Sequence, residues 1–402
     1  MSRLPRLIFA GLMGLALILA ASPASAASDS AFLATLNPAQ QKAFKQWRAA
    51  KAKHERQLDA YWAQVLSKRK ARRRKRSKGV QYVHSDYVLT FPPKYQGREL
   101  SKNLAKRWAR FQARQAGKKP RRKRRSLPGI RDFLAASKKH YGFVPTRISE
   151  REFKRRYARE SLALGLNKVQ VVRVYALETG GNGTADMQAG IHPITKKGRP
   201  ISSALGYAQL LHANTIGELV KHGKTFIKRL QNMRASTRDA ARAKELDNKI
   251  AALKRMMKSA RSVPNDWYKH VRFAKTSRGY GMHAINLDGD IGPWLQSVKL
   301  RGLKDFAARK GVTNLSGEEI ELMNLSGPAT GLEMMKPAGL TAPTTNFFSR
   351  RAYYVNKMVM GKTSAELLVE FTRRMNASSK KPGAIEFAQA FEEVRQAKLP
   401  WQ

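Results

Sequence analysis

Residues 174–183 read Val-Tyr-Ala-Leu-Glu-Thr-Gly-Gly-Asn-Gly, an apolar run that ends at Glu178 and passes directly into a glycine-rich stretch. The apolar residues of this run follow helical spacing, at Val171, Val174 and Tyr175. Asn167 is suited to cap the first turn of such a helix, and two successive glycines are suited to end it. Glu178 is therefore expected where a buried helix opens into a polar loop that continues to about residue 199.

A carboxyl group in that position is partly removed from water, which raises its pKa toward the range in which a protonated acid donates at neutral pH. The carbonyl groups at a helix C-terminus act in the same direction, because their partial negative charge disfavours a carboxylate. From the local pattern alone, Glu178 is either a solvated residue at a helix end or a general acid.

Helical patterns also surround this segment. Ser149 and Glu152 have the spacing of a capping box that opens a helix ending near Leu164. Further helices are predicted from Ser202 or Ser203 through 208–211, and at 216–230, 237–260, 291–310, 316–323, 349–360, 364–375 and 385–397. The pair 216–230 and 237–260 predicts a long helical hairpin. Strand-like alternation is scarce apart from residues 80–89, so the predicted fold class is mainly α.

The first residues have the pattern of a secretory signal. Residues 1–6 carry two arginines, residues 7–21 are almost wholly apolar, and Ala24-Ser25-Ala26 matches the small-x-small cleavage pattern. The apolar run is shorter than the roughly 20 residues that span a bilayer. We expect residues 1–26 to be a signal peptide, with no transmembrane span after cleavage and the mature protein in the periplasm or cell envelope.

The next segment, 27–145, carries 32 basic and 6 acidic residues, part of a net charge of +50 over 402 residues. Its densest runs, 68–76 and 121–125, are expected to stay solvated. Helical pieces are predicted at 38–66 and 100–116. The segment is either a partly disordered cationic arm that attracts any polyanion or a dedicated binding module for a wall polymer.

Several site chemistries are excluded by composition. The chain has no cysteine, which excludes disulfides, cysteine-ligated zinc, iron–sulfur clusters and cysteine nucleophiles. Its histidines show no metal-ligand spacing, and it has no phosphate-binding loop or nucleophile elbow. We expect no cofactor and no metal, which leaves carboxylates and hydroxyls for chemistry.

Five segments, in order, resemble motifs of the soluble lytic transglycosylase family, whose domain has the goose-type lysozyme fold. They are Tyr175–Thr179 (the Glu-Ser segment), Ala204–Leu211 (Gly-Ala-x-Gly-Leu-Met-Gln), Asp290–Leu295 (Asn-Ile-x-x-Gly), Met323–Pro328 (Ala-Tyr-Asn-Ala-Gly-Pro) and Tyr353–Met358 (Tyr-Val-x-Lys-Val). The resemblance runs from about 149 to 360. It implies a lysozyme-like domain at 146–362, with an insertion at about 216–270, followed by C-terminal helices at 363–402.

The resemblance implies that Glu178 is the single general acid/base that cleaves the bond between N-acetylmuramic acid and N-acetylglucosamine, leaving 1,6-anhydro ends. The implied substrate-binding residues are Thr179, Tyr207, Gln209, Asn324 and Tyr354. The partners are then peptidoglycan glycan strands and, through the basic arm, anionic envelope polymers. The sequence departs from the family pattern at Ala208 and Met323, where the family has Met and Tyr, and at Thr179, where it has Ser.

Three alternatives stay open. A hydrolase would need a second carboxylate across the sugar, and the available ones are Asp186, Glu218, Asp288 and Asp290. A lysozyme-like fold without catalysis would be a wall-binding scaffold. A nucleic-acid-binding protein is suggested by charge alone, but the export signal and the lack of a recognition motif oppose specific nucleic-acid binding.

Overall fold

The computed structural model describes residues 23–117 and 127–397. Most of the expected signal peptide and the basic run 121–125 lie outside the described residues. The chain is mainly α, as predicted, and its described residues form isolated β-bridges but no strand. None of the helices in these two ranges is long and apolar enough to cross a membrane.

The chain divides into two compact units. The first comprises residues 1–61 and 92–123, and its described part contains α1 (Pro23–Leu33), the first half of α2 (Pro38–Ser77) and α3 (Lys102–Gly117). The rings of Phe32, Phe44 and Trp108 are buried together, with centroids 4.8–5.0 Å apart. This part of the arm therefore has an aromatic core of its own, and the predicted helices 38–66 and 100–116 are confirmed.

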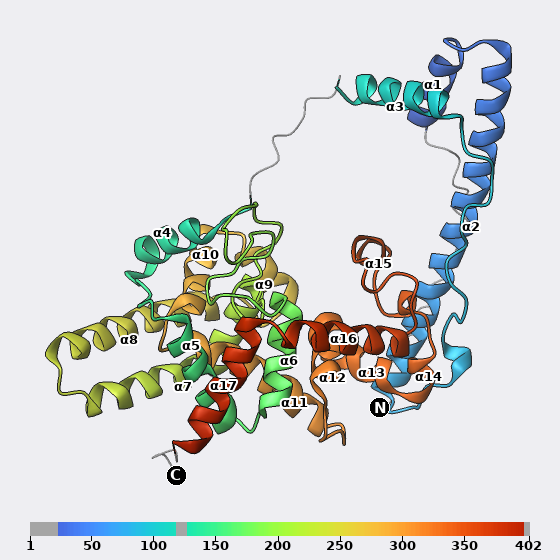
Figure 1. The fold of residues 1–402 in the computed structure, drawn as a ribbon. Helices are drawn as coiled ribbons and strands as arrows, with labels where there is room; N and C mark the ends of the chain where they lie inside the picture. Colours follow the sequence, from blue (N-terminus) through green and yellow to red (C-terminus); the bar gives the residue numbers. More distant parts are fainter. Residues whose placement is uncertain (1–22, 118–126, 398–402) are drawn as a thin grey trace, which may run out of the picture. The chain divides into compact units, whose positions relative to one another are not determined.

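The second unit comprises residues 62–91 and 124–402. It contains the rest of α2 and the short helix η1 (His84–Asp86). Its other elements (Figure 1) are α4 (Ile130–Tyr141), α5 (Glu150–Ala163), α6 (Lys168–Thr179), α7 (His212–Ser236), α8 (Ala240–Arg261), α9 (Trp267–Phe273), α10 (Ser277–His283), η2 (Ala284–Leu287), α11 (Gly292–Ala308), α12 (Gly317–Ser326), α13 (Pro328–Met335), α14 (Pro337–Leu340), η3 (Thr344–Asn346), α15 (Arg350–Val355), α16 (Ser364–Ser379) and α17 (Pro382–Gln396).

The C-terminal helices belong to the same core as α6. α17 packs against α5 and α16 packs against α6. Phe387 of α17 is fully buried against Tyr157 and Tyr175, with ring centroids 5.3 and 5.2 Å away. Residues 363–397 are thus not a separate appendage, since they pack on α5 and α6 and contribute to the hydrophobic cluster next to Glu178.

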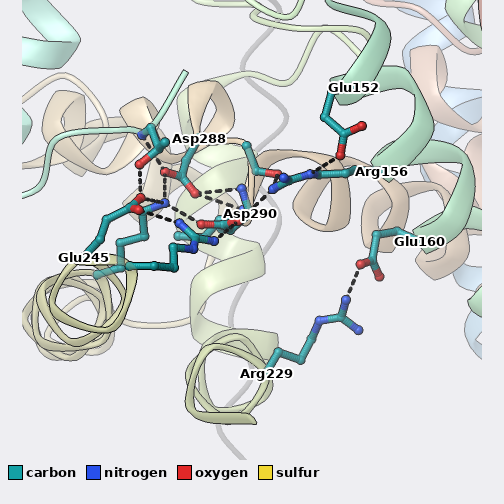
Figure 2. A network of polar contacts seen from close by, with 12 residues as sticks. Glu152, Arg156, Glu160, Arg229, Glu245, Asp288 and Asp290 are labelled. Atoms are coloured by element: carbon teal, nitrogen blue, oxygen red, sulfur yellow. Dashed lines mark hydrogen bonds and ion pairs between the residues drawn. The ribbon is translucent and has the colours of Figure 1, made fainter. Parts of the chain in front are cut away.

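The predicted hairpin is present as α7 and α8, which pack against each other (Figure 1). An ion network fixes it to the rest of the unit (Figure 2). Lys249 of α8 is buried, and its Nζ lies 2.9 Å from Asp288 and 2.5 Å from Asp290. Arg242 of α8 and Arg156 of α5 also contact Asp290, at 2.6 and 2.8 Å. Both aspartates are therefore used to anchor the hairpin.

The basic run 68–76 is not fully solvated, contrary to the prediction. It continues α2, and Arg72 is 1% exposed. Its guanidinium donates to Glu333 at 2.7 Å and to the carbonyl groups of Asp86 and Asn346 at 2.9 and 2.8 Å. The guanidinium of Arg69 donates to the same carbonyl of Asn346 and to two further ones, those of Thr345 and Phe348. The second compact unit therefore begins at Trp62, and not near residue 146.

The strand-like alternation at 80–89 does not correspond to a strand. The backbone is extended on both sides of η1, but Val88 pairs with a side chain and not with another strand. Asn346 accepts from the N–H of Val88 at 2.9 Å and donates to the carbonyl of Val88 at 2.7 Å. The amide group of one residue thus satisfies both backbone groups of Val88.

Candidate active site

Glu178 lies in the last turn of α6, as predicted. The helix begins at the N-cap Asn167, whose side chain accepts from the N–H of Gln170, and it ends at Gly180 in the left-handed conformation. The helix around Glu178 belongs to the core, since Tyr175, Ala176 and Thr179 are buried. Glu178 itself is partly buried.

Helix α12 brings two polar side chains to Glu178. Asn324 donates through Nδ2 to the carboxylate of Glu178 at 3.0 Å and to that of Glu321 at 3.3 Å. Glu178 and Glu321 also hydrogen-bond to each other. Glu321 and Asn324 are three residues apart and so lie on one face of the helix. Asn324, one of the expected binding residues, therefore lies against Glu178.

Glu321 was not identified from the sequence. A signal was present, because it stands between Ile320 and Leu322 in a helix whose neighbouring residues are apolar, three positions before Asn324. The side chain is 3% exposed. A glutamate between apolar residues, three positions before an expected site residue on the same helix, is therefore the sequence pattern that could have identified Glu321.

Burial governs the protonation of this carboxyl pair. It raises the pKa of Glu178 to about 7, although hydrogen bonds from Glu321 and Asn324 act in the opposite direction. Burial also raises the pKa of Glu321, and the charge of Glu178 raises it further. Near neutral pH, the pair therefore retains a proton that two exposed glutamates would have lost.

Two other expected binding residues are part of the structural core. The hydroxyl of Thr179 donates to the carbonyl of Tyr175 at 2.6 Å and is buried. Tyr207 is 1% exposed, and its hydroxyl donates to Glu150 at 2.6 Å. Its ring has no face open to a ligand, because Phe153 and Tyr175 pack edge-on against it. We assign both side chains a structural role.

Gln209 lies in a turn and not in the predicted helix. The backbone at Gly206 and Gln209 has positive φ, at 75° and 42°, and Leu205 pairs with Leu210 in an antiparallel bridge. The helix predicted to reach 208–211 is therefore wrong, and α7 begins at His212. The amide of Gln209 donates to the carbonyl groups of Gly206 and Met187 at 2.7 and 3.3 Å. The N–H groups of this side chain therefore stabilise the loop that contains Gln209.

Tyr354 is 42% exposed at the end of α15. Its ring lies 5.1 Å from that of Tyr353 and 6.0 Å from that of Trp62, both edge-on. Helix α15 ends at Val355, five residues before the predicted end. Of the expected binding residues, Asn324 contacts Glu178 and Tyr354 presents an exposed aromatic surface.

The loop after Glu178 is held close to the core. The hydroxyl of Tyr175 donates to the carbonyl of Gly183 at 2.8 Å, and both carboxylate oxygens of Glu150 accept from the N–H of Ala185 at 3.0 Å. Gly181 has φ +78°, and a Cβ there would lie 2.1 Å from the carbonyl oxygen of Ser378. This close approach requires glycine.

Gly181→Ala should therefore destabilise the protein by more than Gly180→Ala. Gly180 also has positive φ, at +65°, but a Cβ there would meet nothing within 4 Å. We expect Gly180→Ala to cost about 1–2 kcal/mol, the left-handed penalty alone, and Gly181→Ala to cost more because Ser378 must move. Chemical unfolding of the two variants tests this, and equal losses would contradict the close contact.

Two cavities lie elsewhere in the second unit. One, of about 320 Å³, lies between residues 142–146 and α8, and the other, of about 390 Å³, lies beside α4 and α10. Neither is lined by Glu178. Among residues 23–117 and 127–397, no group of three or more His, Asp or Glu residues is placed to hold a metal ion. No protein-family model, curated protein or solved structure matches this chain.

Proposed function

We propose that this protein is an exported lytic transglycosylase that cleaves the β-1,4 bond between N-acetylmuramic acid and N-acetylglucosamine in peptidoglycan. The observation that carries the proposal is a partly buried Glu178, hydrogen-bonded to Asn324 at 3.0 Å and with its pKa raised by burial to about 7. A carboxylic acid with this pKa is suited to general acid–base catalysis near neutral pH.

In the proposed reaction, Glu178 donates its proton to the glycosidic oxygen as the bond to the anomeric carbon of N-acetylmuramic acid breaks. The resulting carboxylate then accepts the proton of the muramic 6-hydroxyl as that oxygen bonds to the same carbon. The products are a 1,6-anhydromuramyl end and a free N-acetylglucosamine 4-hydroxyl. Glu178 ends the cycle protonated, so one carboxyl group serves both steps.

The placement of the other carboxylates favours this reaction over hydrolysis. A hydrolase needs two carboxyl groups separated by about 5–9.5 Å, on opposite sides of the sugar. Glu321 is hydrogen-bonded to Glu178, which is too close for that role. Asp288 and Asp290 are buried in the ion network of the hairpin.

The two remaining candidates also lie next to basic side chains. Glu218 is buried, with Lys221 and His222 at 3.4 and 3.5 Å. Burial would raise the pKa of Asp186, but hydrogen bonds from Thr184 and Lys196 lower it to about 2. We therefore assign neither of them the second carboxylate's role.

The first compact unit is proposed to attach the enzyme to anionic polymers of the envelope. Its aromatic core leaves basic side chains on the exposed surfaces of α2 and α3. They include Lys42, Lys45, Lys102, Lys106, Arg110 and Arg114. Charge attraction of this kind raises the local concentration of enzyme on a polyanionic substrate without requiring a specific contact.

The decisive experiment is digestion of purified sacculi with the mature protein, followed by mass spectrometry of the released muropeptides. We expect anhydro ends, which are one water lighter than hydrolysed ends. Hydrolysed ends would replace the proposal with a lysozyme-type reaction. No release from intact sacculi or from soluble glycan fragments would contradict both reactions.

The rate of cleavage should depend on pH through Glu178. Because the acid form is required and the pKa of Glu178 is about 7, kcat/KM should be nearly constant in mildly acidic solution. It should then fall about tenfold for each pH unit above 7. Soluble glycan fragments at constant ionic strength are the appropriate substrate, because they avoid charge effects on sacculus binding. A rate that stays constant to pH 9 would contradict the assignment of Glu178 as the acid.

A further inference from the structure

We propose that Glu321 is a positioning residue that donates a hydrogen bond to Glu178 and thereby stabilises the carboxylate form that Glu178 must adopt as a base. The inference rests on the proposed function, and it assigns a role to a buried acid that the reaction itself does not use.

A count of hydrogen-bond donors supports a proton between the two carboxyl groups. Asn324 Nδ2 carries two hydrogens, which are directed to Glu178 at 3.0 Å and to Glu321 at 3.3 Å. The direct hydrogen bond between Glu178 and Glu321 then needs a hydrogen of its own. Since two carboxylates are both acceptors, one of the pair must be protonated.

The difference in burial indicates which group keeps this proton. Glu321 is 3% exposed in the interior of α12, whereas Glu178 is partly exposed at the end of α6. An ion is more costly in the more buried position, so Glu321 remains neutral and Glu178 ionises first. The charged group facing the pair is Lys299 of α11, whose own pKa is lowered by burial. The positive charge of Lys299 lowers the pKa of Glu321, but by less than burial raises it.

The hydrogen bonds from Glu321 and Asn324 offset the effect of burial on Glu178. A carboxyl group that is only desolvated holds its proton too strongly to act as a base in the second half of the reaction. Two donors, Glu321 and Asn324, stabilise the carboxylate of Glu178 after it has protonated the leaving group. The balance between burial and these donors keeps Glu178 usable in both directions near neutral pH.

The test compares Glu321→Leu with Glu321→Gln by their pH profiles. Leu removes the donor, so the alkaline limb of kcat/KM should move to higher pH by about one to two units, because a hydrogen bond to a charged group is worth about 10- to 100-fold in its ionisation. Gln retains an N–H donor and is neutral at every pH, so the limb should stay near its original position. Glu321→Gln is thus the conservative rescue.

Glu160→Gln is the matched control. Glu160 is another partly buried glutamate with a raised pKa, but it is paired with Arg229 (Figure 2). This substitution should leave the limb unchanged. If instead Glu321 were ionised at neutral pH, both Glu321 variants would remove a repelling charge and move the limb to lower pH. That result, or no movement with Leu, would overturn the inference.

A second measurement separates this inference from the proposed function. In substrate-free protein, the carboxyl carbon of Glu178 can be titrated by ¹³C NMR and assigned by its loss in Glu178→Gln. The Leu variant should again titrate at higher pH than the wild type and the Gln variant. If this shift occurs in a protein that releases nothing from glycan strands, the positioning role stands and the transglycosylase proposal fails. If turnover occurs without the shift, the positioning role fails alone.

Discussion

Glu178→Gln should lower the rate of anhydromuropeptide release from sacculi by about 10²- to 10⁴-fold, the usual contribution of a general acid–base group. Glutamine is nearly the same size, and its carbonyl oxygen can still accept from Asn324, which donates to Glu178 at 3.0 Å. The fold should therefore be retained while the transferable proton is lost. The rate is measured by quantifying anhydro ends over time, with Glu160→Gln as the control expected to remain active.

The same variant separates the proposed enzyme from a wall-binding scaffold. An inactive Glu178→Gln protein should still sediment with sacculi and should be released by salt, because attachment depends on the basic surface and not on Glu178. If the wild-type protein binds sacculi but has no turnover to lose, the scaffold is the correct interpretation. Salt-dependent binding to DNA without affinity for sacculi would favour the nucleic-acid alternative.

Arg72→Ala should destabilise the second compact unit by about 3–5 kcal/mol, the usual cost of removing one partner of a buried ion pair. Arg72 is 1% exposed, and its loss would leave the carbonyl of Asp86 without its donor. Glu333 would keep only the longer contact with Arg76 at 3.5 Å, and the carbonyl of Asn346 would keep only Arg69 at 3.0 Å. The measurement is the midpoint of urea unfolding. Arg74→Ala is the matched control, since Arg74 is an exposed residue of the same basic run, and it should change stability by less than about 0.5 kcal/mol.

A double variant makes the prediction for Arg72 more specific. Removing both charges with Arg72→Met and Glu333→Leu should recover part of the lost stability, because no unpaired buried charge remains. The recovery should be incomplete, since the carbonyl of Asp86 still lacks the donor that Arg72 supplied and the carbonyl of Asn346 keeps only Arg69. Equal losses for Arg72→Ala and Arg74→Ala would show that the buried contact contributes little. Deletions that test the basic arm should accordingly spare residues 62–91, which belong to the second unit.

Local features of the sequence were sufficient to predict most of the helices near Glu178. The N-cap residues Ser149 and Asn167 each accept from the N–H three residues later, as their spacing predicts. The capping box at Ser149 is only half formed, because the carboxylate of Glu152 pairs with Arg156 instead. Such features are predictable because they depend on residues within one turn of each other.

Predictions that depended on a charge pattern or on a single residue were less successful. A run of nine residues, 68–76, contains eight basic ones and reads as solvated, yet Arg72 is buried. The buried position of Arg72 depends on Glu333 and on the carbonyl of Asn346, both more than 250 residues away in the chain. Nothing local to the run indicates those partners.

The amino-acid sequence by itself determined a mainly helical chain, a helix that ends at Glu178 before two glycines, and a partly desolvated carboxyl group at that end. Only the tertiary structure decided that Glu321 and Asn324 lie against this group, that Tyr207 belongs to the core, and that Arg72 is buried. The physical reason is distance along the chain. Helix periodicity and caps arise between near neighbours, whereas the pKa of Glu178 depends on a helix more than 130 residues further on.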